Sequence, residues 1–116
     1  MRKEIEIDGK MVPFRATGAT PRIYRNMFNR DIFVDMMHLD TEVGKGGVLN
    51  SDSLELFENL AYTMAVQAAK QDGTQLPATP DEWLDTFEVL SIYDILPQLM
   101  ELWKMNNETL VDSKKK

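Results

Sequence analysis

The sequence has no cysteine, a single histidine and no long apolar run in its 116 residues. The lack of cysteine excludes disulfides, thiolate metal sites and cysteine nucleophiles. No segment approaches the roughly 20 consecutive apolar residues of a membrane helix, and the opening MRKEIEIDGK lacks the apolar core of a secretory signal. We therefore expect a protein without a membrane partner that stays in the cytoplasm of the cell that makes it.

Motifs for catalysis and cofactor binding are also scarce. His38 has no second histidine or nucleophilic-serine signature beside it, so a packing or surface role is expected. The glycine-rich segment Gly44–Gly47 lacks the spacing of a phosphate-binding loop and is expected to be a connector. The four carboxylates between Asp81 and Glu88 do not follow a calcium-loop pattern and fit a solvated helix face. We predict no enzyme activity, no cofactor and no metal.

Length and composition favour one folded domain. Apolar residues make up 43% of the chain and charged residues 28%, as in ordinary globular proteins, and a chain of this length supports one modest core. We expect an α+β fold, a predominantly α-helical single domain over residues 1–106. Its β-hairpin lies at residues 3–15 and its helices span 20–106, with a flexible polar tail at 107–116.

Turn and cap residues mark the first elements. Asp8-Gly9 between short apolar runs is a strong hairpin signal, because both turn positions tolerate positive φ. Thr20 followed by Pro21 predicts a helix with Thr20 as its N-cap. Apolar residues at helical spacing then continue to Leu39, and we expect a break near Asn29–Asp31.

The clearest helix is predicted to start at Ser51 or Asp52, where Glu55 follows Asp52 in a capping-box-like arrangement. Leucine, phenylalanine, methionine and alanine side chains recur on one stripe until Asp72-Gly73 ends the run. This pattern predicts an amphipathic helix that packs on one side.

Two more helix starts follow. Thr79 and Glu82 form a capping box, and Ser91 is expected to cap a last helix that Pro97 kinks or delays near its start. The side chains expected to be buried on these two helices are Trp83, Leu84, Phe87, Leu90, Ile92, Ile95, Leu96, Leu99, Leu102 and Trp103.

Charge is unevenly distributed within the net charge of −6. Residues 1–30 carry seven basic and three acidic side chains, whereas residues 52–101 carry one basic and ten acidic side chains. Such blocks can steer a basic partner or pair one copy with another, or they only keep the protein soluble. The overall acidity argues against nucleic-acid binding. The candidate charges for self-association into a homo-oligomer are Arg22, Arg25, Arg30, Asp81, Asp85 and Glu88.

Three phrases, taken together, resemble a known family. They are ATGATPRIYRNMFNRDIFVDM at residues 16–36, LFENLAYTMA at 56–65 and PDEWLDTFEVLSIYDILPQLMELW at 80–103, followed by a lysine-ended tail. In this order they resemble the tail assembly chaperones of Gram-positive siphophages and prophages. The resemblance implies that the protein binds the tape measure protein, keeps it soluble until tail tube protein polymerises around it, and is absent from the mature virion.

Members of this family are often made in two lengths by ribosomal frameshifting, so the resemblance also implies a longer form of the same protein as a partner. We hypothesise that Lys114–Lys116 are encoded by an A-rich slippery run, with a charged, solubilising tail as the alternative. A slippery heptamer in the gene and an overlapping downstream reading frame are required by this hypothesis.

The resemblance transfers no catalytic residue, so candidate partner-binding residues come from the large apolar side chains. Aromatic anchors carry much of the energy of protein interfaces, and flexible methionines, of which there are eight, accept several apolar shapes. Most of these side chains are expected in the core, and the sequence alone does not sort core from interface. The candidates are Tyr24, Phe28, Phe33, Met37, Trp83, Phe87 and Trp103.

Other functions stay open at this point. The main alternative is a structural tail or head-completion protein that is retained in the virion. An enzyme or nucleotide-dependent factor would depend on His38 and on Gly44–Gly47, and an acidic regulator that mimics nucleic acid would depend on the block at residues 52–101.

Overall fold

The fold combines one β-hairpin with a set of helices around a central helix. The computed structural model describes residues 1–44, 50–88 and 90–104. The expected tail at 107–116 and most of the Gly44–Gly47 connector lie outside these residues. The elements are β1 (Arg2–Ile7), β2 (Lys10–Arg15), α1 (Thr20–Phe28), α2 (Ile32–Gly44), α3 (Ser51–Gln71), α4 (Pro80–Leu84), the 3₁₀ helix η1 (Leu90–Ile95) and α-helical turns over residues 96–104.

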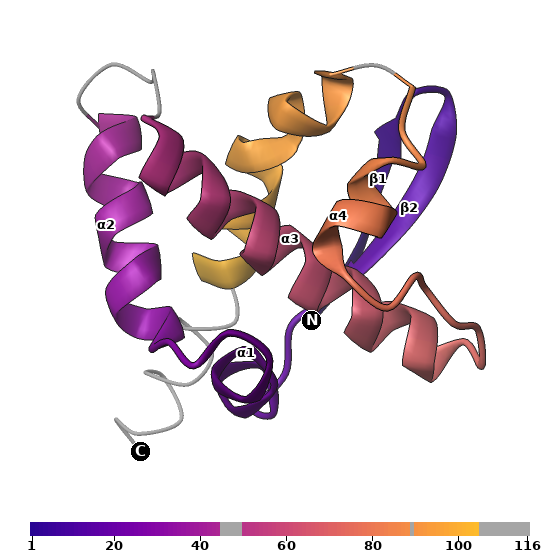
Figure 1. Ribbon diagram of the computed structural model, residues 1–116, viewed down its shortest axis with the longest axis horizontal. Helices are drawn as coiled ribbons and strands as arrows, with labels where there is room; N and C mark the ends of the chain where they lie inside the picture. The colour runs from indigo at the N-terminus through magenta and orange to yellow at the C-terminus, as the bar shows by residue number, and fades with distance from the viewer. Residues whose placement is uncertain (45–49, 89, 105–116) are drawn as a thin grey trace.

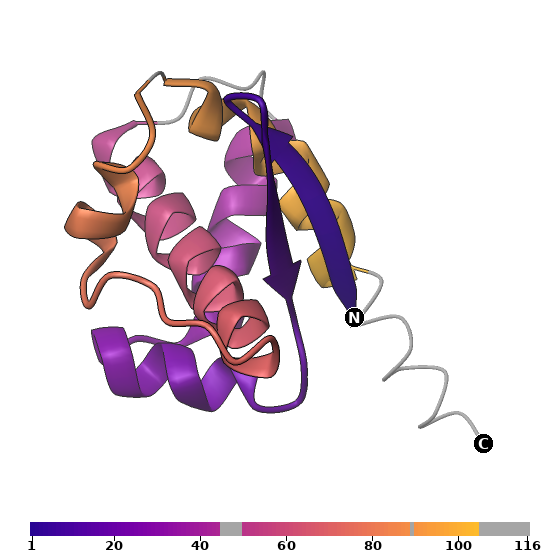
Figure 2. The ribbon, with the colours of Figure 1, turned by 90° about the vertical axis from the view of Figure 1, so that its right-hand side faces the viewer.

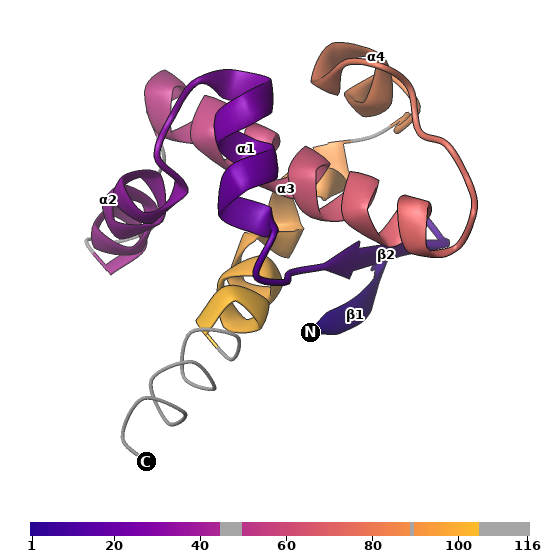
Figure 3. The same cartoon turned by 90° about the horizontal axis from the view of Figure 1, so that it is seen from below.

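Figure 1 shows α3 crossing the middle of the molecule, with α2 at one end and the hairpin and α4 at the other. Figure 3 shows the same division from below. A single hydrophobic core runs from the hairpin through α3 to the C-terminal helical turns. The predicted α+β class, mostly helical with an N-terminal hairpin, is confirmed. Among the described residues, no helix has the length and apolar character needed to cross a membrane.

The hairpin forms where the Asp8-Gly9 turn predicts it. Both turn residues have positive φ, 53° and 75°, and the two strands pair antiparallel with Ile5 opposite Val12. Ile5, Ile7 and Phe14 are buried on one face. β2 packs on α3, and β1 lies beside η1 and the turns that follow it (Figure 2).

The break between α1 and α2 falls at the predicted place, because Asn29 adopts the left-handed conformation with φ of 56°. The predicted cap of α1 is wrong. Ala19 is the N-cap residue, and the hydroxyl of Thr20 is buried, where it accepts a hydrogen bond from the Thr17 amide at 2.8 Å and donates one to Gln67 of α3. Thr20 thus ties the start of α1 to the central helix.

The start and end of α3 are as predicted, but its cap and its surroundings differ. Asn50, not Asp52, caps it by accepting a hydrogen bond from the Ser53 amide at 2.9 Å. The helix is not buried on one stripe only: six consecutive residues, Leu60–Ala65, are all buried, which is more than a full turn. No charged residue occurs between Glu58 and Lys70 in the sequence. From this uncharged run, a central helix that is buried on all sides could have been predicted.

The C-terminal third is partly as predicted. Thr79 caps α4 by accepting from the Glu82 amide at 3.2 Å, but α4 has only five residues, so the expected longer helix does not form. Ser91 caps nothing: it lies inside η1, and its buried hydroxyl has no partner among the described residues. The α-helical turns begin at residue 96, next to Pro97, as the predicted delay requires. The side chain of Leu90 lies outside the description, and Leu84 and Phe87 are half-buried. Those confirmed as buried are Trp83, Ile92, Ile95, Leu96, Leu99, Leu102 and Trp103.

Candidate functional site

The outer face of α2 exposes large apolar side chains next to one another. Phe33, Val34 and Met37 have 48%, 59% and 69% of their surface exposed. Met37 follows Phe33 by four positions and Val34 by three, and residues three or four positions apart are neighbours on a helix surface. These three side chains therefore form one strip, which we call the α2 ridge. The opposite side of α2 is also apolar and lies in the core, so α2 is apolar on two sides.

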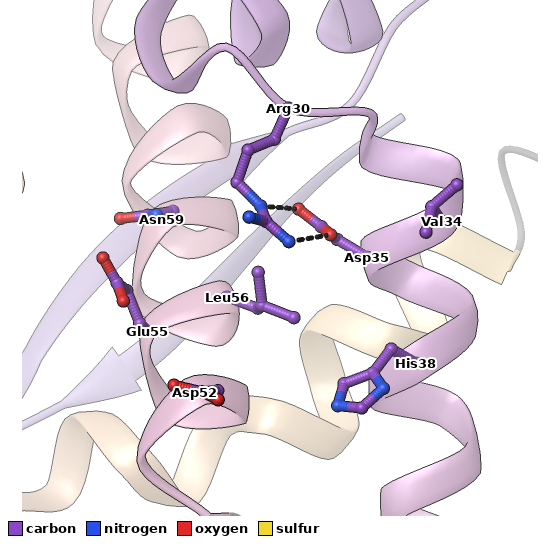
Figure 4. A pocket seen from close by; sticks show the side chains of 8 residues that line it. All are labelled: Arg30, Val34, Asp35, His38, Asp52, Glu55, Leu56 and Asn59. Atoms are coloured by element: carbon purple, nitrogen blue, oxygen red, sulfur yellow. Dashed lines mark hydrogen bonds and ion pairs between the residues drawn. The ribbon is translucent and has the colours of Figure 1, made fainter.

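A groove between α2 and α3 borders the ridge on one side, and we call it the α2–α3 groove. It has a volume of about 480 Å³. Its lining includes Asp52, Glu55 and Leu56 of α3 and Asp35 and His38 of α2. In Figure 4, Leu56 points from α3 toward α2, whereas Glu55 extends along the outer side of α3. The complete lining is Arg30, Val34, Asp35, His38, Asp52, Glu55, Leu56 and Asn59.

A second groove, of about 340 Å³, borders the ridge on its other side, between α2 and the helical turns at residues 96–104. Phe33 of the ridge packs over Trp103 there, with 5.5 Å between ring centroids. Its charged groups, Asp40 and Lys104, pair with each other at 3.1 Å. This second groove is therefore apolar with a neutralised rim.

A buried network of polar side chains fastens α2 to α1. The Asp35 carboxylate is almost fully buried; Tyr24 Oη donates to its Oδ2 at 2.7 Å, and Arg30 donates to both oxygens at 2.8 Å (Figure 4). Burial alone raises the pKa of the Asp35 carboxyl, but the hydrogen bonds from Arg30 and Tyr24 outweigh it and hold the pKa below its ordinary value. Burial, and then the bond to Asp35, raise the pKa of Tyr24. Asp35 is thus an ion at neutral pH that Arg30 neutralises within the fold.

His38 does not form a catalytic relay with its neighbours. Its Nε2 lies 3.1 Å from Ser53 Oγ and 3.9 Å from a Glu42 carboxylate oxygen, so one ring nitrogen faces both groups. A relay from carboxylate to nucleophile needs both ring nitrogens. Ser53 is also fully buried, where no substrate reaches it. No group of metal-ligating side chains that could hold an ion occurs in the described part of the chain.

The structure sorts the predicted partner-binding residues into three groups. Phe33 and Met37 are exposed on the α2 ridge, and Phe28 and Phe87 are half-buried. The three candidates that lie in the core are Tyr24, Trp83 and Trp103. The reason differs for each: Tyr24 bonds to Asp35, Trp83 packs against Phe14, Tyr62 and Phe87, and Trp103 is covered by Phe33.

Val34 belongs to the ridge and was absent from the candidate residues. The signal was its place beside Phe33 and one turn before Met37, opposite the buried Ile32, Met36 and Leu39. Helical spacing alone does not say which of two apolar sides is covered, because that depends on the neighbouring helices.

The predicted self-association charges also divide. Arg30 pairs with Asp35 of the same chain. The other five are exposed and form no ion pair with any described residue; they are Arg22, Arg25, Asp81, Asp85 and Glu88. Part of the opposed charge pairs internally, since Arg2 contacts Asp72 at 2.7 Å and Lys3 lies 3.5 Å from Glu101. Self-association through the remaining charges stays a prediction.

Comparison with known proteins adds no relative. No protein-family model, no curated protein and no solved structure matches the chain. The resemblance to tail assembly chaperones therefore depends on the sequence phrases at residues 16–36, 56–65 and 80–103, and the functional argument depends on the surface that α2 presents.

Proposed function

We propose that this protein is a tail assembly chaperone that binds the tape measure protein and keeps it soluble while tail tube protein polymerises around it. The sequence phrases support the family, and the α2 ridge is the observation that carries the proposal. Three adjacent large apolar side chains face solvent beside two grooves, and such patches on a small protein are typical of interaction surfaces. In this proposal the protein acts in the cytoplasm of the bacterial host, without catalysis.

The ridge is suited to weak, reversible binding. Fully burying a valine, phenylalanine or methionine side chain contributes about 1.5–3 kcal/mol, so three partly covered ones contribute roughly 3–4 kcal/mol per copy. Lost motional freedom on association offsets much of this. Many copies along one long client would nonetheless hold it firmly through avidity, and each would detach when tail tube protein arrives.

The test is co-expression with the tape measure protein of the same phage or prophage, followed by measurement of that protein in the soluble and pelleted fractions. The wild-type chain is expected to move it into the soluble fraction, and the Phe33→Ser, Met37→Ser double variant is expected to lose most of this effect. Met11→Ser is the matched control, because Met11 is 60% exposed but lies on β2, at the other end of the molecule (Figure 1).

An equal effect of the double variant and the wild type would contradict the proposed surface. A tape measure protein that stays in the pellet beside the wild-type chain would contradict the proposed function. Mass spectrometry of purified particles separates the main alternative, because a chaperone should be absent from them and a structural tail or head-completion protein present.

A further inference from the structure

We infer that the α2 ridge and the α2–α3 groove take an amphipathic helix of the client, with lysine or arginine beside its apolar stripe. The stripe packs on Phe33, Val34 and Met37, and the basic side chains enter the groove toward Asp52 and Glu55. The inference rests on the proposed function for the identity of the client, and it names the chemistry of the segment that is bound.

A helical occupant follows from what the surface offers. Apart from Arg30, the ridge and both grooves are built from α2, α3 and the helical turns at residues 96–104, whose backbone groups are mostly hydrogen-bonded within their own helices. An extended segment buried against them would leave its own backbone N–H and C=O groups without partners. A helix satisfies these groups internally and presents side chains at the spacing that a ridge between two grooves accepts.

A basic flank follows from the charges in the α2–α3 groove. Arg30 and Asp35 neutralise each other through two hydrogen bonds. Asp52 and Glu55 are exposed, line the same groove at the α3 side (Figure 4) and form no ion pair with any described residue. The charge left to attract a partner is therefore negative, and a basic side chain complements it.

The second groove accounts for the other flank of the bound helix. Its single carboxylate, Asp40, already pairs with Lys104, and its remaining lining is apolar and includes Met100 and Trp103. Of these two grooves, the α2–α3 groove is therefore the one whose described lining carries unpaired carboxylates. Basic residues in the bound segment are expected to face that groove.

The test uses two synthetic peptides of about 20 residues, long enough to form helix on binding. Both carry the same leucine stripe at helical spacing; one has lysines beside the stripe and the other has glutamates. The wild-type protein is expected to bind the lysine peptide about tenfold more tightly than the glutamate peptide. This is the size of effect expected from two surface ion pairs, one each with Asp52 and Glu55. Isothermal titration at low and high salt measures the affinities, and the preference should shrink at high salt.

Variants locate the preference. Asp52→Asn with Glu55→Gln is expected to abolish it, whereas Asp81→Asn with Asp85→Asn, the same charge change on and after α4, leaves it intact. Met37→Ser is expected to weaken the binding of both peptides equally. Val34→Ser is expected to do the same, and neither variant disturbs the contact between Phe33 and the buried Trp103. Thermal unfolding of each variant checks the fold.

Three results would overturn the inference: a glutamate peptide bound as well as the lysine peptide, a preference that survives removal of both groove carboxylates, or a concentration-dependent dimer that Met37→Ser dissociates while peptide binding is unchanged. The last result would make a second copy the occupant. Failure of this inference can be distinguished from failure of the proposed function. If the groove variant solubilises the tape measure protein as well as the wild type does, only this inference is contradicted. If the peptides bind as expected in all variants but the tape measure protein stays in the pellet, only the proposed function is contradicted.

Discussion

The helices α2 and α3 are both rich in apolar residues, yet the fold uses them differently. In α3 the six residues Leu60–Ala65 are all buried, so the apolar side chains of this segment belong to the core. In α2 one side is buried and the ridge on the other side is exposed. Methionine makes the contrast direct, because Met64 of α3 is fully buried and Met37 of α2 is 69% exposed. The apolar surface of α2 that folding leaves uncovered is what suggests a binding role.

The largest effect on stability is expected at Met64. Met64→Ala removes a side chain with no exposed surface and leaves a cavity in the centre of the fold, which costs about 2–5 kcal/mol. Urea denaturation followed by far-UV circular dichroism measures the free energy of unfolding. A loss below about 1 kcal/mol would mean that α3 is less tightly surrounded than its burial indicates.

A smaller, pH-dependent effect is expected at Asp35, because α2 is held by a charged network and α3 by apolar packing. The pKa of Asp35 is lowered in the folded state, so its stabilisation is complete above the unfolded pKa of about 4 and is lost as pH falls through the folded value. Asp35→Asn should cost about 1–3 kcal/mol at pH 7 and progressively less at acid pH.

The measurement is the difference in free energy of unfolding between wild type and Asp35→Asn at several pH values, which cancels the contribution of the other carboxylates. Asp40→Asn is the control, because Asp40 and Lys104 form an exposed pair whose loss costs less than about 1 kcal/mol. A difference that stays constant from neutral to acid pH would contradict the role given to the Asp35 charge.

The smallest effect on stability is expected at Met37, where Met37→Ala should change the free energy of unfolding by no more than about 0.5 kcal/mol. The same change should reduce solubilisation of the tape measure protein, whereas Met11→Ala should affect neither property. Urea denaturation and the co-expression assay give the two readings. A strongly destabilised Met37→Ala protein would show that the ridge belongs to the folding core and would remove the contrast with α3.

Local residues predicted most element boundaries. Asp8-Gly9 forms the hairpin turn, Asn29 separates α1 from α2, Gly73 follows the end of α3 with φ of 74°, and Thr79 caps α4. Turn and cap preferences act within a few residues, so they can be read along the chain. The prediction fails for Thr20 and Ser91, whose hydroxyls are drawn into the interior, and neither serves as a cap.

The sequence by itself therefore determined the class of fold, the hairpin and the places where most helices begin and end. Only the tertiary structure decided that Tyr24 is buried while Phe33 and Met37 face solvent, and that Arg30 pairs with Asp35 of the same chain. Burial and ion pairing depend on which distant segments arrive beside a side chain, and helical periodicity carries no information about that arrival.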